Sequence, residues 1–206
     1  MLQSDQSRTF NSTRWTLLTA AGLAAGLTAG VLAGIPLGRI LNAMIVTGVV
    51  TCVVGAVLGA FQAAGLRGLI ARPLWWVAAT MMGVGIGLVL GVVAVEEAGK
   101  FITGVPPRVA HLGTAMRALS FVTVGLIAGS VLGVAQWVVL RAQRPDVRHW
   151  VLVCGAALAA AFCAASLLID VAGIQFASAV GRISFVVLSG ILFGGLTSWP
   201  LRSAAA

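Results

Sequence analysis

Charged residues divide the chain into six long uncharged stretches. They cover residues 15–38, 40–66, 73–95, 118–140, 149–169 and 183–201. Each stretch is close to the ~20 residues that a helix needs to cross a hydrocarbon core of ~30 Å. None of them alternates apolar and polar residues over about ten positions, as a strand of a membrane barrel does. The pattern predicts an all-α, polytopic membrane helical bundle of six transmembrane helices.

Two sequence patterns alternate along these stretches. The second, fourth and sixth stretches end alike, most clearly as GSVLGVAQWVVLR at residues 129–141. The first, third and fifth begin at or near Trp15, Trp76 and Trp150. Self-similarity of this kind indicates a repeated structural unit. We therefore predict three parallel two-helix hairpins with pseudo-threefold symmetry, at residues 15–67, 76–141 and 150–202.

These repeats are expected to form a single transmembrane domain over residues 1–206. The second repeat carries an inserted loop near 96–117, and residues 1–13 form a polar tail. We see no cleavable signal peptide in that tail, since it lacks an apolar segment followed by a small-residue cleavage site.

Small residues recur every four positions in the uncharged stretches. Between helices in lipid, van der Waals packing replaces the hydrophobic effect, and small residues allow the close approach that this packing needs. We assign twelve glycines to helix packing: Gly22, Gly26, Gly30, Gly55, Gly59, Gly83, Gly87, Gly91, Gly129, Gly133, Gly190 and Gly194.

Composition and charge agree with a membrane location. The chain is 60% hydrophobic and 9% charged, with a mean hydropathy of +1.07, values far from those of soluble domains. The net charge of +8 does not indicate nucleic-acid binding, because the basic residues flank the helix ends. Their distribution predicts a bacterial cytoplasmic (inner) membrane protein with both termini in the cytoplasm. Expected partners are membrane lipids and either other membrane subunits or further copies of the chain.

Polar residues recur at one position near the predicted cytoplasmic boundary. Gln62, Gln136 and Thr197 occupy it, and we interpret them as a structural hydrogen-bonding layer, with a ligand or ion site as the alternative. Five residues later follow Arg67, Arg141 and Arg202. These arginines are expected to anchor the helix ends or to contact anionic lipid headgroups or an acidic partner.

Tryptophans gather near the same boundary, at positions 75, 76, 137, 150 and 199. Such residues are typical of an aromatic belt at the membrane surface.

Acidic residues mark the opposite side of the membrane. Glu96, Glu97 and Asp170 are candidates for an outer-face acidic site, although a solvated helix end explains them as well. The three cysteines, Cys52, Cys154 and Cys163, are expected to pack as small apolar residues. We find no catalytic constellation and no metal motif, and the sequence requires no cofactor. Lipid, quinone or pigment remain candidate ligands.

The ending GxxxGxxQWxxLR, complete at 129–141 and partial at 55–67 and 190–202, resembles that of small multi-spanning bacterial membrane proteins of unknown function. The resemblance covers the spans and implies no activity.

Three functions follow as hypotheses. The first is a non-enzymatic accessory or scaffold subunit of a larger membrane complex, which packs lipid, quinone or pigment along its glycine-lined faces. The second is a transporter or channel for a small neutral or lipophilic solute, with Gln62, Gln136 and Thr197 as its constriction. The third is a lipid-modifying enzyme, which would need Glu97, Lys100 and His111 to cluster.

Overall fold

A computed structural model describes residues 10–103, 113–142, 149–176 and 178–203. This part of the chain contains six helices and no strand: α1 (Ser12–Leu37), α2 (Ala43–Gly65), α3 (Pro73–Thr103), α4 (Thr114–Leu140), α5 (Trp150–Val171) and α6 (Ala179–Ser203). All six helices are long and apolar enough to cross a membrane. The chain is therefore an all-helical, multi-pass membrane protein, as the uncharged stretches predicted.

Local sequence signals account for several helix starts. The side chains of Asn11 and Asn42 cap α1 and α2 by accepting hydrogen bonds from the backbone N–H groups of Arg14 and Ile45, at 2.9 and 3.0 Å. Pro73 is the first residue of α3, the helical position that best tolerates a missing N–H.

The loop predicted near 96–117 is too long. Helix α3 continues through Glu96 and Glu97 to Thr103, and α4 begins at Thr114. Glutamate, alanine and lysine are good helix formers, so charge at this point indicates the end of the hydrocarbon contact rather than the end of the helix.

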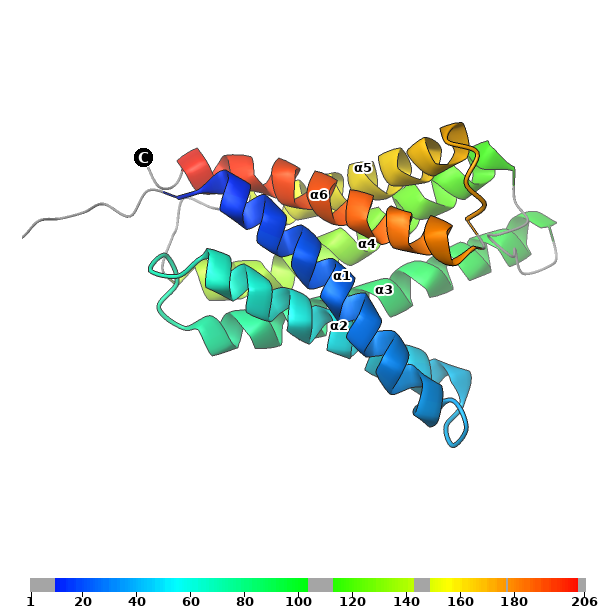
Figure 1. The fold of residues 1–206 in the computed structure, drawn as a ribbon, viewed down its shortest axis with the longest axis horizontal. Helices are drawn as coiled ribbons and strands as arrows, with labels where there is room; N and C mark the ends of the chain where they lie inside the picture. Colours follow the sequence, from blue (N-terminus) through cyan, green and yellow to red (C-terminus); the bar gives the residue numbers. More distant parts are fainter. Residues whose placement is uncertain (1–9, 104–112, 143–148, 177, 204–206) are drawn as a thin grey trace, which may run out of the picture.

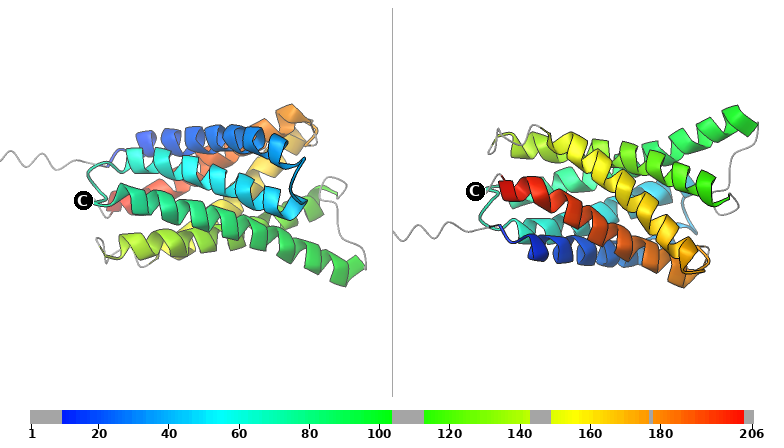
Figure 2. Two further views of the ribbon diagram at one scale, coloured as in Figure 1. Left: turned by 90° about the horizontal axis from the view of Figure 1, so that it is seen from below. Right: turned by 90° about the horizontal axis from the view of Figure 1, so that it is seen from above.

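The helices form a closed ring. Each helix packs along its neighbours in the sequence, and α6 packs along α1; within the described residues these are the only helix pairs whose backbones approach each other closely. In Figure 1 the first residues of α1 and the last residues of α6 lie at the same end of the ring, which we call the terminal end. The views in Figure 2 show the helices diverging toward the other, distal end.

Glycines make the contacts of this ring. All twelve glycines assigned to packing are buried, and a Cβ added to any of them would lie within 3.1 Å of an atom of the adjacent helix. Gly26 faces Val54 of α2 within the first hairpin, whereas Gly129 faces Cys154 across the α4–α5 contact. Glycines therefore lie both within hairpins and between successive hairpins. Their faces are occupied by neighbouring helices and are not open to lipid.

Candidate ligand-binding lumen

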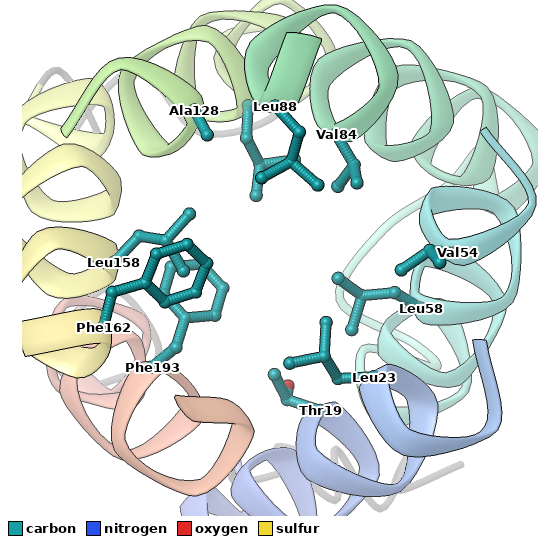
Figure 3. A pocket seen from close by; sticks show the side chains of 11 residues that line it. Thr19, Leu23, Val54, Leu58, Val84, Leu88, Ala128, Leu158, Phe162 and Phe193 are labelled. Atoms are coloured by element: carbon teal, nitrogen blue, oxygen red, sulfur yellow. The ribbon is translucent and has the colours of Figure 1, made fainter. Parts of the chain in front are cut away.

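A cavity lies at the centre of the ring. It has a volume of about 50 Å³, and all six helices contribute to its lining, with Thr19, Leu23, Val54, Leu58, Val84, Leu88, Ala128, Leu132, Leu158, Phe162 and Phe193. Figure 3 shows the labelled side chains pointing inward from every side of the ring. Thr19 is the only one of these side chains that carries a polar group. The middle of the ring is therefore apolar.

A larger chamber adjoins this cavity on the distal side. Its volume is about 380 Å³, and it shares Leu23, Val54, Leu88 and Phe162 with the central cavity. Four phenylalanines, Phe121, Phe162, Phe176 and Phe185, pack against one another along its wall, with ring centroids 4.7–6.3 Å apart. We call the cavity and the chamber together the lumen. No charged side chain is among the described residues that line it.

Three tryptophans fill the terminal end of the ring. Trp15, Trp76 and Trp150, at the starts of α1, α3 and α5, are at most 1% exposed. Trp76 packs against both of the others, with ring centroids 6.5 and 6.4 Å apart. The aromatic-belt prediction is therefore wrong for Trp76 and Trp150. It agrees with the exposure of Trp75 (64%) and Trp199 (77%).

A polar layer lies between the tryptophans and the cavity. It consists of Gln62, Thr80, Gln136 and Thr197, all buried. The Gln136 amide nitrogen donates to Gln62 Oε1 at 3.1 Å and to Thr80 Oγ1 at 3.0 Å. The indole N–H of Trp150 donates to Gln136 Oε1 at 3.2 Å.

Thr197 belongs to a separate part of this layer. It accepts a hydrogen bond from the indole N–H of Trp15 at 3.1 Å, and its own hydroxyl donates to the Phe193 carbonyl at 2.8 Å. The structure thus brings Gln62 and Gln136 into direct contact and bonds Thr197 to a tryptophan instead. Each of these bonds joins two helices, except the bond from Thr197 to Phe193.

Among the residues that the structure describes, four buried side-chain polar atoms have no hydrogen-bond partner: Thr19 Oγ1, Gln62 Nε2, Trp76 Nε1 and Ser189 Oγ. Thr19 lines the central cavity and Ser189 lines the distal chamber. Gln62 Nε2 and Trp76 Nε1 lie toward the terminal end of the ring, and both are N–H donors. A buried polar group without a partner costs about 1–3 kcal/mol, so an added hydrogen-bond partner would be stabilising at these atoms.

The arginines predicted to contact lipid lie at the terminal end. Arg67 and Arg141 are exposed; Arg141 directly follows α4, and Arg67 is the second residue after α2. The Arg141 guanidinium lies 4.9 Å from the centroid of the Trp137 ring. Arg202 lies near the end of α6, but its side chain is outside the described residues. Interaction of these arginines with anionic lipid headgroups stays a prediction.

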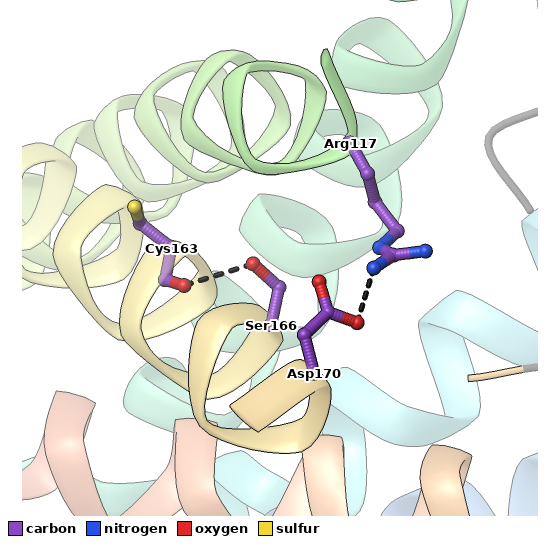
Figure 4. Close-up of polar contacts among 4 residues, drawn as sticks. All are labelled: Arg117, Cys163, Ser166 and Asp170. Carbon is purple, nitrogen blue, oxygen red and sulfur yellow. Dashed lines mark hydrogen bonds and ion pairs between the residues drawn. The ribbon is translucent and has the colours of Figure 1, made fainter. Parts of the chain in front are cut away.

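One of the three acidic candidates makes an ion pair. Asp170 on α5 pairs with Arg117 on α4, and Figure 4 shows this pair beside Ser166, whose hydroxyl donates to the Cys163 carbonyl at 2.8 Å. Glu96 and Glu97 are exposed on α3, and an acidic site that includes all three residues stays a prediction. No group of three or more His, Cys, Asp or Glu side chains able to hold a metal ion occurs in the described part of the chain.

The ion pair should stabilise the α4–α5 contact modestly. Both side chains are partly exposed, at 13% and 20%, and pairs of this kind contribute about 0.2–1 kcal/mol. In a double-mutant cycle of Arg117→Gln and Asp170→Asn, we expect a coupling energy in that range, measured by unfolding in mixed micelles. A coupling energy of zero would show that the pair is not formed in the membrane protein.

The recurring polar position predicted Gln62, Gln136 and Thr197, but not the residues that bond to them or the threonine beside the cavity. Trp15, Trp150 and Thr80 supply or accept the hydrogen bonds of the layer, and Thr19 lines the cavity. A signal was available, because Thr19, Thr80 and Cys154 each follow a repeated tryptophan by four residues. One helical turn separates them from that tryptophan, which places both on the same helix face.

No protein-family model matches this sequence, and no curated protein or solved structure shows significant similarity to it. The function is therefore argued from the lumen and its lining.

Proposed function

We propose that this chain is a non-enzymatic integral membrane protein that holds one lipophilic molecule in its lumen, as an accessory or scaffold subunit of a larger membrane complex. The observation that carries this proposal is the apolar lumen to which all six helices contribute. Its distal chamber of about 380 Å³ falls within the ~300–1,000 Å³ typical of small-molecule sites.

The lumen replaces the glycine faces as the expected place for a ligand. The glycines are buried against neighbouring helices, whereas the outward surface carries large apolar side chains such as Leu17, Leu32 and Val171. Bulk lipid can cover that outer surface without any specific recognition. A defined molecule such as a quinone, a pigment or a single lipid is better matched by the apolar lumen at the centre of the ring.

Binding is favoured over transport of a small neutral or lipophilic solute along the ring axis. A pathway for such a solute would have to continue from the apolar lumen through both ends of the ring. At the terminal end the axis meets three tryptophans that are almost fully buried. The lipid-modifying cluster of Glu97, Lys100 and His111 has no support here, since His111 and the Lys100 side chain lie outside the described residues.

We also retain the three-hairpin repeat with a pseudo-threefold axis as part of the proposal. Supporting it, the ring order follows the chain order, and glycines pack at corresponding places within and between hairpins. The bacterial inner membrane, the cytoplasmic location of both termini and assembly with other subunits or further copies are proposed on the sequence pattern alone.

The test is to purify the chain from its native source in a gentle detergent and to identify what remains bound by native mass spectrometry. We expect one retained lipophilic molecule per chain, together with other membrane polypeptides. A chain that carries only a distribution of bulk lipids would argue against a specific ligand.

A matched pair of variants assigns that molecule to the lumen. Leu88 lines both the cavity and the chamber, whereas Leu90 of the same helix is 48% exposed on the outer surface. Because a larger side chain at Leu88 would fill part of the lumen, Leu88→Trp is expected to reduce retention at least about tenfold. Leu90→Trp should leave retention unchanged. Equal retention by the two variants would exclude the lumen as the site.

A further inference from the structure

We propose that the lumen selects a lipophile with an uncharged hydrogen-bond acceptor, a carbonyl oxygen, and that the Thr19 hydroxyl at the closed end of the lumen donates to it. This inference rests on the proposed function and adds the chemical class of the ligand. The carbonyl could belong to a quinone or to the ester of a lipid, and the experiment below distinguishes these sources.

The first support is the position of the Thr19 hydroxyl. Thr19 is 1% exposed and lines the central cavity (Figure 3). Its Oγ1 makes no hydrogen bond, whereas Thr16 and Thr28 of the same helix donate to the carbonyls of Ser12 and Ala24 at 2.9 and 3.0 Å. The usual partner of a helical threonine is thus not used at Thr19, which leaves a buried hydroxyl without a partner on a residue that lines the cavity.

A water molecule is a poor occupant for this place. A buried water needs about two to four polar partners, and Thr19 has the only polar side chain in the cavity lining. An organic molecule fits better, because its carbon atoms contact the leucines, valines and phenylalanines while one polar atom meets the hydroxyl.

The closed end of the ring favours an acceptor over a donor. Two buried N–H groups there have no acceptor, Nε1 of Trp76 and Nε2 of Gln62. Gln62 follows the lining residue Leu58 by one helical turn. A buried N–H donor without an acceptor favours the negative end of a nearby carbonyl dipole over a second donor.

The same surroundings exclude a charged headgroup. No charged side chain lines the described lumen, and an ion moved there would lose its hydration without gaining a counter-ion. A second unpaired hydroxyl, that of Ser189 on α6, lines the distal chamber. An uncharged molecule with an acceptor at the cavity and its apolar remainder in the chamber therefore matches the lining.

The experiment measures binding of three probes to the delipidated full-length chain in detergent micelles by native mass spectrometry. The probes are an alkyl-substituted benzoquinone, a fatty-acid methyl ester and an n-alkane of matched chain length. Thr19→Val keeps the shape of the side chain and removes its hydroxyl. We expect it to weaken binding of a carbonyl probe about 3- to 10-fold, the effect of one net hydrogen bond, and to leave alkane binding unchanged.

Two further variants serve as controls. Thr19→Ser restores the hydroxyl and should restore binding of the carbonyl probe, while Thr28→Val removes a hydroxyl that is already bonded to its own helix and should have no effect. Loss confined to the quinone identifies a quinone as the source of the carbonyl, and loss confined to the ester identifies a lipid.

The result that overturns this inference is an equal effect of Thr19→Val on all three probes, or no effect on any of them. In either case the proposed function still stands if Leu88→Trp abolishes binding. If the wild-type chain binds no probe, or if Leu88→Trp changes nothing, the proposed function fails as well.

Discussion

Replacement of Gly129 by alanine is expected to lower the free energy of unfolding by about 1–3 kcal/mol, the usual cost of overpacking a well-packed contact. A Cβ at this position would overlap the Cys154 carbonyl oxygen and would lie 2.9 Å from the Gly155 Cα. Both are backbone atoms of α5, so no side-chain rotation can relieve the overlap. Helices α4 and α5 would therefore have to move apart at the point where Gly129 allows their close approach.

Gly195 provides the matched control for this prediction. It lies on α6, is exposed, and a Cβ there would meet no atom within 4 Å. Alanine has a helix propensity up to ~1 kcal/mol better than glycine, so Gly195→Ala should leave stability unchanged or raise it slightly. Unfolding by a denaturing detergent, followed by circular dichroism in mixed micelles, measures both variants. Equal stability of the two would contradict the close α4–α5 contact.

Replacement of Gln136 by leucine is expected to destabilise the bundle by about 2–4 kcal/mol, through loss of several hydrogen bonds and the partners left without them. Gln136 donates to Gln62 and Thr80 and accepts from Trp150. These bonds join α4 to α2, α3 and α5, and all the groups involved are buried. Leucine would leave the Trp150 indole N–H buried without an acceptor.

Gln62→Leu should cost much less, about 1 kcal/mol or below. The Gln62 side chain accepts one hydrogen bond, from Gln136, and its amide nitrogen has no partner. Its removal therefore loses one bond and also eliminates one unsatisfied donor. The same detergent titration compares the two variants. If Gln62→Leu proved as damaging as Gln136→Leu, the arrangement of hydrogen bonds in the polar layer would be wrong.

Much of the fold could be predicted from the distribution of charge. Six stretches without Asp, Glu, Lys or Arg became six helices in the same order, because a membrane span must keep ionised groups out of hydrocarbon. The end of α3 could not be predicted in this way. Helix propensity continues beyond Glu96 and Glu97 to Thr103, and only the limit of the apolar surface was visible in the sequence.

The candidate site was predictable only in part. The recurrence of Gln62 and Gln136 indicated a buried polar layer, and both are 1% exposed. The burial of Trp76 was not predictable, since its neighbour Trp75 is 64% exposed. Successive residues of a helix point about 100° apart, so which of two adjacent tryptophans faces the ring depends on how the helix is rotated against its neighbours.

The hydrophobic pattern and the spacing of small residues are local properties, so they are enough to predict a membrane protein, its six spanning helices and the glycines that bring those helices together. Closure of the helices into a ring through α1 and α6, with an apolar lumen at its centre and tryptophans at one end, is visible only in the folded structure. Closure depends on contacts between residues far apart in the chain, such as Gly190 with Ala20. The size of the lumen depends on the angles at which the six helices pack together. No single stretch of the sequence encodes those angles.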